Sequence, residues 1–158
     1  MTNIHPVGVN DRHKTLFEGL WPLPFGVSYN AYIIDDEKVA LVDTVEVDFF
    51  SQFIDNVRRV IGDRPIDYII VNHMEPDHAA TMQELVLRYP EVRIVCNAKT
   101  LNMIKNYFTF DVTDRVKLVK EMETLTTGRH TFAFVMAPMV HWPEVMVTYD
   151  TTDKVLYS

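Results

Sequence analysis

The chain has 158 residues, of which 47% are hydrophobic and 23% are charged, and its formal net charge is -7. A chain of this length and composition can bury one core, whereas its negative charge and the absence of a Lys/Arg run argue against a nucleic-acid surface or a polybasic membrane anchor. Its segments are too short or too polar for a membrane span or a signal peptide, so we expect a cytoplasmic protein without nucleic-acid or membrane partners.

The first half of the chain predicts strands that alternate with helices. Residues 28–43 are typical of a β-hairpin, because two apolar, β-branched runs flank a polar turn at residues 35–38. The stretch just before it is expected to be irregular, because it contains Pro22, Pro24 and Gly26.

Helical spacing of apolar residues begins at Val47 and predicts a helix that ends at Gly62. The next predicted elements are a strand at 67–71, a short helix at 82–89, a strand at 92–96 and a helix at 98–108. The only cysteine, Cys96, ends an apolar run, which indicates a buried strand thiol rather than a catalytic one. A lone cysteine also fits a reducing compartment.

The second half predicts an antiparallel meander. Its expected strands are 116–119, 131–136, 145–149 and 154–158, with turns at Gly128 and at 151–153. Together, the two halves predict an α/β (α+β) layered fold.

Four side chains of the metal-ligand type fall within six residues, directly after an apolar strand: His73, Glu75, Asp77 and His78. Pro76 disfavours helix at Glu75, so we expect an irregular loop that points alternate side chains into one cleft. Such a pocket needs a cation to compensate its carboxylates, and nitrogen and oxygen ligands without thiolate suit iron, manganese or zinc. The alternative is a solvated polar loop, and we favour the metal site.

His141 lies in an apolar loop, Pro138–Pro143, between two predicted strands. Taken alone, such a histidine is more often a hydrogen-bonded structural residue, but the first cluster leaves room for a ligand from a neighbouring loop. We interpret His5, His13 and His130 as surface or capping residues.

These residues resemble the pattern of the flavodiiron proteins. The pattern is His-x-Glu-x-Asp-His after a strand, followed by Ala-Pro-x-x-His-Trp-Pro, and it matches residues 73–78 and 137–143 here. Glu75 carries the specificity, because the wider metallo-β-lactamase superfamily, which consists mostly of zinc hydrolases, has histidine at that position. The resemblance covers almost the whole chain, including residues 7–11, 27–35 and 40–44.

The resemblance implies a metallo-β-lactamase-like αββα sandwich with two non-haem iron ions. His73, Glu75 and His141 would bind the first iron, and Asp77 and His78 the second; no catalytic residue is implied beyond these metal ligands. The implied reaction is the reduction of O2 to water or of NO to N2O, with electrons from a donor such as rubredoxin. The implied full-length protein is a homodimer or homotetramer.

Parts of the family pattern are absent. A bridging aspartate follows a strand that ends like residues 155–158, a further histidine comes later still, and a flavodoxin-like domain binds FMN. We therefore expect residues 1–158 to form a truncated diiron domain, without FMN-binding residues, that does not turn over alone. Asn72 and Glu144 are candidate hydrogen-bond partners of the ligating histidines. The alternatives are a zinc-dependent hydrolase of the same superfamily and a non-catalytic metal-binding fragment.

Overall fold

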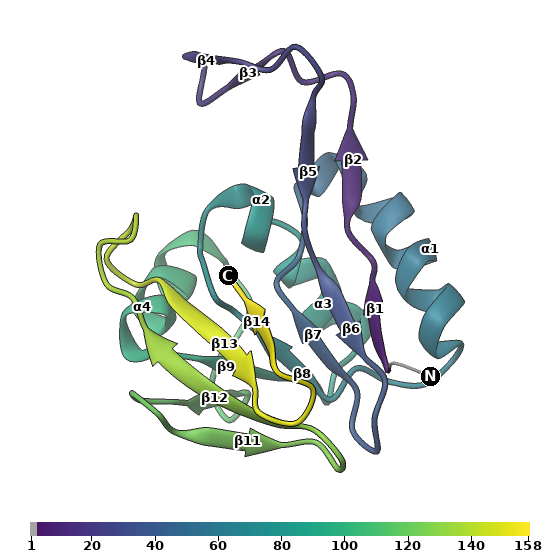
Figure 1. Ribbon diagram of the computed structural model, residues 1–158, viewed down its shortest axis with the longest axis vertical. Helices are drawn as coiled ribbons and strands as arrows, with labels where there is room; N and C mark the ends of the chain where they lie inside the picture. Colours follow the sequence, from purple (N-terminus) through teal and green to yellow (C-terminus); the bar gives the residue numbers. More distant parts are fainter. Residues whose placement is uncertain (1–2) are drawn as a thin grey trace.

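The computed structural model describes residues 3–158, which form a layer of helices and two packed sheets (Figure 1). The first sheet has six strands in the order β1 (Ile4–Pro6), β6 (Tyr32–Ile34), β7 (Ala40–Val42), β8 (Tyr68–Ile70), β9 (Arg93–Cys96) and β10 (Val116–Leu118). The second sheet has the order β11 (Thr124–Thr126), β12 (Thr131–Met136), β13 (Met146–Asp150) and β14 (Val155–Tyr157). Two small ribbons pair β2 (Val9–Asp11) with β5 (Val27–Tyr29), and β3 (Leu16–Phe17) with β4 (Trp21–Pro22).

The helices are η1 (Val47–Phe49), α1 (Phe50–Ile61), α2 (Pro76–Ala79), α3 (Met82–Arg88) and α4 (Ala98–Tyr107). In Figure 1, α1, α3 and α4 lie behind the first sheet, and the second sheet covers its other face. α1 ends at Gly62, whose φ of +62° is one that glycine adopts without strain. Within residues 3–158, no helix is both long and apolar enough to cross a membrane.

The strands of the first sheet contribute to two separate cores because successive side chains point to opposite faces. Leu41 and Ile69 pack in the core that contains α1, whereas their neighbours Val42 and Ile70 pack against the second sheet. These four side chains are at most 2% exposed. Burying each such side chain stabilises the fold by about 1.5–3 kcal/mol, so the alternation holds three layers together.

The predicted α/β class is confirmed, as are the hairpin of β6 and β7, the helix ending at Gly62 and the buried Cys96 thiol. Three of the four layers of the implied αββα sandwich lie within the part of the chain that the structure describes. Burial raises the pKa of the Cys96 thiol to about 12, so it is unreactive near neutral pH.

Four details of the predicted layout are wrong. β10 was expected in the meander, but it pairs in parallel with β9 in the first sheet, because α4 carries the chain back over that sheet. The predicted run 29–34 is interrupted after Tyr29, and its two parts, β5 and β6, pair with different strands. The region expected to be irregular contains the short ribbon of β3 and β4, and β11 was not expected.

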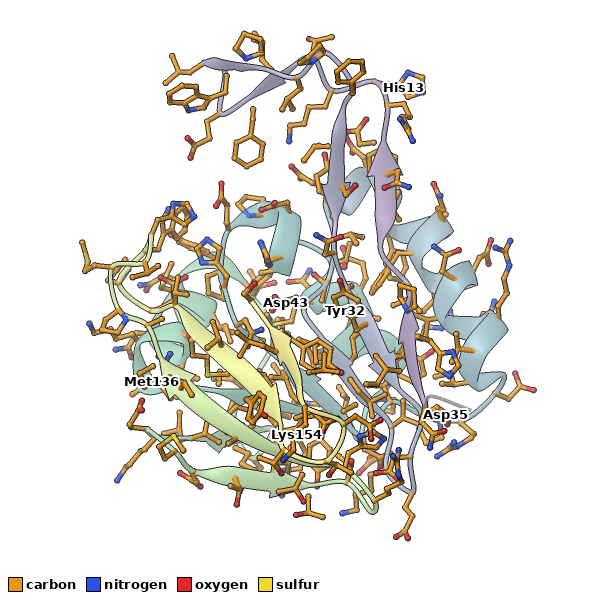
Figure 2. The ribbon with its side chains drawn as sticks, in the orientation of Figure 1. His13, Tyr32, Asp35, Asp43, Met136 and Lys154 are labelled. Atoms are coloured by element: carbon orange, nitrogen blue, oxygen red, sulfur yellow. The ribbon has the colours of Figure 1, made fainter. Side chains whose placement is uncertain are left out.

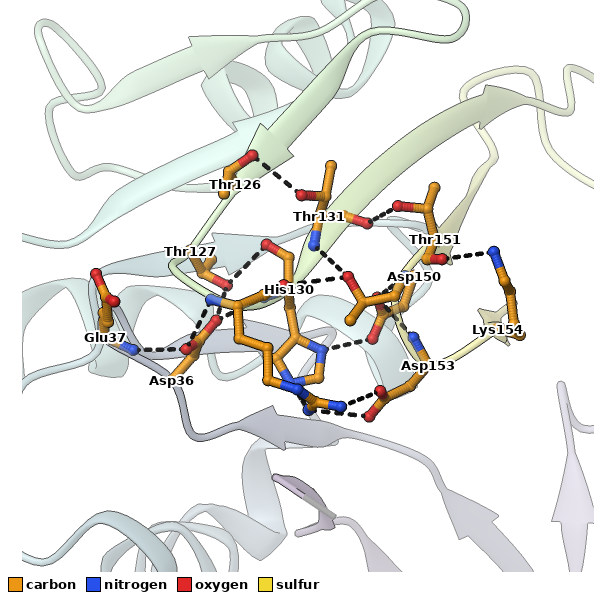
Figure 3. Close-up of polar contacts among 12 residues, drawn as sticks. Asp36, Glu37, Thr126, Thr127, His130, Thr131, Asp150, Thr151, Asp153 and Lys154 are labelled. Atoms are coloured by element: carbon orange, nitrogen blue, oxygen red, sulfur yellow. Dashed lines mark hydrogen bonds and ion pairs between the residues drawn. The ribbon is translucent and has the colours of Figure 1, made fainter. Parts of the chain in front are cut away.

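His130 is a further correction, because it was interpreted as a surface or capping residue and its side chain is fully buried. Two residues before Phe132 on the same strand face, it turns towards the core between the sheets. There its Nδ1 lies 2.7 Å from Oδ2 of Asp150, and its backbone N–H donates to Asp36 (2.9 Å; Figure 3). Asp36 lies in the β6–β7 turn, so this network joins the two sheets at the end away from the candidate site described next.

Candidate metal centre

The candidate centre lies at the carboxyl ends of β7, β8 and β9, three neighbouring parallel strands in the middle of the first sheet. A polar residue follows each strand within two positions: Asp43 after β7, Asn72 after β8 and Asn97 after β9. All three side chains are at most 9% exposed. The carboxyl ends of parallel strands are where α/β proteins commonly bind ligands, because the loops there are free to carry functional groups.

His73, Glu75 and His141 bring three donor atoms together. His73 Nε2 lies 3.1 Å from Glu75 Oε2 and 3.1 Å from His141 Nε2, and His141 Nε2 lies 3.1 Å from Glu75 Oε2. The first two residues come from the loop after β8, whereas His141 comes from the loop between β12 and β13. The two loops lie side by side, so residues that are 66 or more positions apart in the sequence come together.

The loop expected at His73–Asp77 is correct only up to Glu75, whose φ of -61° and ψ of 145° are extended. The short helix α2 begins at Pro76, so Asp77 and His78 lie on a helical turn. Pro76 both keeps Glu75 out of the helix and starts the helix itself, because its fixed φ and missing N–H suit the first helical position. The sequence interpretation considered only the first of these two effects.

Asp77 and His78 form a second pair beside the three donors. His78 Nε2 lies 3.9 Å from Asp77 Oδ2, and His78 Nδ1 lies 2.9 Å from Asp43 Oδ2. Burial lowers the pKa of His78, but the hydrogen bond to Asp43 and the neighbouring carboxylates raise it above its ordinary value overall. Burial also raises the pKa of Asp77, which His78 partly opposes.

Glu144 orients His73 from behind. Its Oε1 lies 2.7 Å from Nδ1 of His73 and 3.0 Å from the backbone nitrogen of Met74, and the side chain is 1% exposed. A carboxylate only accepts, so His73 carries its proton on Nδ1 and presents the lone pair of Nε2 to Glu75 and His141. By the same reasoning, Asp43 leaves the lone pair of Nε2 on His78 free.

Asn97 and Trp142 support this arrangement. Asn97 caps α4 by accepting from two backbone N–H groups, and its Nδ2 donates to the backbone oxygen of Glu144 (2.6 Å). The Trp142 ring meets the His73 ring edge-on, with centroids 5.0 Å apart. Of the two predicted partners, Glu144 therefore contacts a candidate ligand, whereas the Asn72 side chain bonds Thr148 and Tyr157 instead.

The arrangement fits a metal ion on its own chemistry. Three lone-pair atoms of two imidazoles and a carboxylate converge, and both histidines bonded through Nδ1 turn Nε2 inwards. Oδ1 of Asp77 is buried without a hydrogen-bond partner, as expected of an atom that faces a cation. A divalent ion would satisfy these groups, and iron, manganese and zinc all accept such ligands.

A pocket of about 230 Å³ opens beside these residues. Glu75, Pro76 and Asp77 form one wall, and Trp142 and residues of the N-terminal segment complete it. The His141 side chain is 64% exposed, whereas those of His73 and Glu75 are 8% and 9% exposed. Of the three donor side chains, that of His141 is therefore the most open to solvent.

A second cluster, formed by His130, Asp150 and Asp153, also brings three potential donors within 4.8 Å. Here, however, Arg129 contacts both His130 Nε2 (3.1 Å) and Asp153. Its guanidinium occupies the position that a cation would take, and the donors already have partners. This cluster is a structural network.

The sequence interpretation missed Asp43 as a member of the site. Its Oδ2 holds His78, and its Oδ1 accepts from the backbone nitrogen of Asn72 (2.7 Å), so it connects the ends of β7 and β8. Figure 2 shows it near the middle of the molecule. Its position directly after an apolar strand was the available signal, because the same position identified the cluster that begins at His73.

Comparison with known proteins agrees with the fold. A family model described as "ODP family beta lactamase" matches residues 27–158. The chain belongs to this family. The ODP family match includes all five candidate ligands, because they lie between His73 and His141.

This ODP family chain is similar to several curated proteins and solved structures. The anaerobic nitric oxide reductase flavorubredoxin of Salmonella arizonae is 41% identical, over 99% of this chain and 33% of the relative. The solved structure of the rubredoxin oxygen:oxidoreductase from Desulfovibrio gigas is 33% identical, with a TM-score of 0.90 over 98% of this chain and 38% of that one. The flavodiiron protein from Giardia intestinalis is 28% identical, with a TM-score of 0.91 over 99% and 38%. The chain thus spans about a third of the length of the curated relatives it matches.

Proposed function

We propose that this chain is the metal-binding part of a flavodiiron oxidoreductase that reduces O2 to water, NO to N2O, or both. The observation that carries the proposal is the convergence of Glu75 with His73 and His141 at 3.1 Å. A carboxylate at this position distinguishes the diiron pattern from the zinc hydrolases of the superfamily. The names of the similar proteins, a nitric oxide reductase and an oxygen oxidoreductase, support the same reaction class.

In this proposal His73, Glu75 and His141 hold one iron ion, and Asp77 and His78 contribute to a second. Two protein ligands are few for an iron ion, so the second ion needs further ligands to be bound tightly. Bound ferrous ions would supply electrons and open coordination positions to a small diatomic substrate. The work of this chain is to hold the ligand atoms in place, through Glu144 and Asp43, and to restrict access to the pocket beside Trp142.

The proposal extends to the whole protein. Residues 1–158 would be part of a diiron domain, and a flavodoxin-like domain with FMN would deliver electrons from a donor such as rubredoxin. Reducing O2 to two waters consumes four electrons and four protons, and coupling two NO to N2O and water consumes two of each. We propose a homodimer or homotetramer for the full-length protein.

Metal loading tests the proposal. The purified chain is loaded anaerobically with ferrous ion, desalted and analysed for metal content and intact mass. We expect about one tightly held iron per chain, lost in His73→Ala and retained in His13→Ala, whose side chain is exposed and is not among the converging donors. A wild-type chain that retains no iron, or a His73→Ala chain that retains as much as wild type, contradicts the proposed site.

The zinc hydrolase alternative is tested in the same preparation. We expect the zinc-loaded chain to show no hydrolysis of a chromogenic ester or thioester above the metal-free chain, and the ferrous chain to bind NO with a change in visible absorption. Hydrolysis that depends on zinc and is lost in Glu75→Ala would favour the alternative. Metal binding without any NO binding would favour a non-catalytic metal-binding role.

A further inference from the structure

The loop between β12 and β13 carries two residues of the candidate centre, the ligand His141 and Glu144, which orients His73. Figure 1 shows this loop and α4 on the same side of the molecule. Asn97, the residue before α4, joins the two, because its Nδ2 donates to the backbone oxygen of Glu144 (2.6 Å). Asn97 is 9% exposed, so water competes little for this hydrogen bond.

Both ends of the Asn97 side chain are in use. Its Oδ1 accepts from the backbone nitrogens of Lys99 (2.9 Å) and Thr100 (3.0 Å), two groups of the first helical turn that have no partner within α4. Such a cap needs only an oxygen, which serine or aspartate would also supply. The amide nitrogen is therefore free for a second contact, and the capped oxygen holds the amide so that this nitrogen faces Glu144.

The position of the Glu144 carboxylate depends on this backbone contact. Its Oε1 bonds His73 and the backbone nitrogen of Met74, whereas Oε2 has no partner that would hold it from the other side. Within residues 3–158, the Glu144 backbone makes no hydrogen bond other than the one from Asn97. A pocket of about 330 Å³ lies between the start of α4 and this loop, so the loop has room to shift once that bond is lost.

We propose that Asn97 is a positioning residue of the metal centre, which acts through Glu144 on the orientation of His73 and so couples the start of α4 to metal affinity. The inference rests on the proposed function, because it requires His73 to bind a metal ion. The coupling is reciprocal: a metal ion that fixes His73 also fixes Glu144 and steadies the cap of α4. Direct partners of ligating histidines contribute about 10–100-fold to metal affinity, and Asn97 acts one contact further away.

Competition with a chelator for cobalt(II) tests this inference. Asn97→Ser keeps an oxygen that caps α4 and removes the amide nitrogen that reaches Glu144. We expect it to weaken cobalt binding by about fivefold. In the Glu144→Gln background the same substitution should weaken binding by less than about twofold, because the hydrogen bond that Asn97 positions is already weakened.

Asn56→Ser is the matched control. The Nδ2 of Asn56 donates to the backbone oxygens of Val7 and Gly8 (3.1 Å each), which lie in a segment without candidate ligands. This variant should bind cobalt within about twofold of wild type. An equal loss of affinity in both variants would mean that affinity follows general stability, and it would overturn the inference.

Amide hydrogen exchange of the wild-type chain gives a test that needs no variant. Cobalt should slow exchange at Lys99 and Thr100 by about fivefold, since the coupling is reciprocal, and this effect should disappear in Asn97→Ser. Exchange at these amides that is the same with and without bound cobalt, or wild-type affinity in Asn97→Ser, overturns the inference while the metal site stands. A wild-type chain that takes up no cobalt overturns the proposed function, and the inference with it.

Discussion

Replacing Glu144 by Gln removes the negative charge behind His73 and keeps the shape of the side chain. The amide oxygen can still accept from His73 Nδ1 and from the backbone nitrogen of Met74, at the present 2.7 Å and 3.0 Å. What is lost is the charge assistance, because a hydrogen bond to a carboxylate contributes about 1.5–3 kcal/mol and a neutral one about 0.5–1.5 kcal/mol. The difference of about 1.5 kcal/mol corresponds to about a tenfold loss in metal affinity.

The metal-free fold should respond differently. In the metal-free fold, Glu144→Gln weakens the same hydrogen bonds but also removes a buried charge whose Oε2 has no partner, and these two effects oppose each other, so we expect the free energy of unfolding to change by less than about 1 kcal/mol. Glu144→Ala, in contrast, leaves the buried N–H of Met74 without an acceptor and creates a cavity, which together cost about 3 kcal/mol.

Two measurements separate these effects. Competition with a chelator gives the metal affinity, and urea denaturation of the metal-free chain gives the free energy of unfolding. We expect Glu144→Gln to lower the first and spare the second, and Glu144→Ala to lower both. Wild-type metal affinity in Glu144→Gln, or equal destabilisation of the metal-free chain by both substitutions, would refute an orienting role for the carboxylate.

Three further outcomes follow from groups elsewhere in the fold. Burial raises the pKa of Asp36, but hydrogen bonds from three backbone N–H groups and a threonine hydroxyl lower it to about 2 overall, below its ordinary 3.8. Because the folded-state pKa is the lower one, the ionised carboxylate stabilises the fold above about pH 4, and that stability is lost as the pH falls through about 2. Asp36→Asn should therefore cost about 1–2 kcal/mol in urea denaturation at pH 7 and much less at pH 2. An equal cost at both pH values would contradict this. His130→Ala should lower the free energy of unfolding by about 3 kcal/mol, since it leaves Oδ2 of the fully buried Asp150 without its partner, and should leave iron content unchanged; a loss of iron would contradict a structural role. Cys96, with its pKa of about 12, should resist iodoacetamide at pH 8 in the native chain and react in urea, and rapid native alkylation would show that the strand opens readily.

Local sequence pattern was enough for most of the secondary structure and for part of the site. Alternation and helical spacing predicted β7, β8, β9, α1 and α4, because each depends on neighbours within a few residues. The cluster from His73 to His78 was visible for the same reason, since its side chains and Pro76 are adjacent in the chain. Glu75 also carried the family resemblance, which the match of the family model to residues 27–158 supports.

Sheet membership and the partners of each polar group depended on contacts between distant segments. A strand such as β10 has the same local pattern in a parallel or an antiparallel pair, and only the path of α4 brings it beside β9. His130 differs from a surface histidine only through the register that turns it towards Asp150.

The same holds for the candidate centre. His141, Glu144 and Asp43 reach the His73 loop from other parts of the chain, across 35 to 71 residues of sequence for the hydrogen-bonded pairs. A local sequence pattern can therefore predict ligands. The hydrogen bonds of 2.7–2.9 Å that orient His73 and His78 form only when the loops at the ends of the strands pack together. The sequence alone identifies most of the donor residues, because their side-chain chemistry is local. Their orientation depends on how the loops at the carboxyl ends of the strands pack in the folded protein.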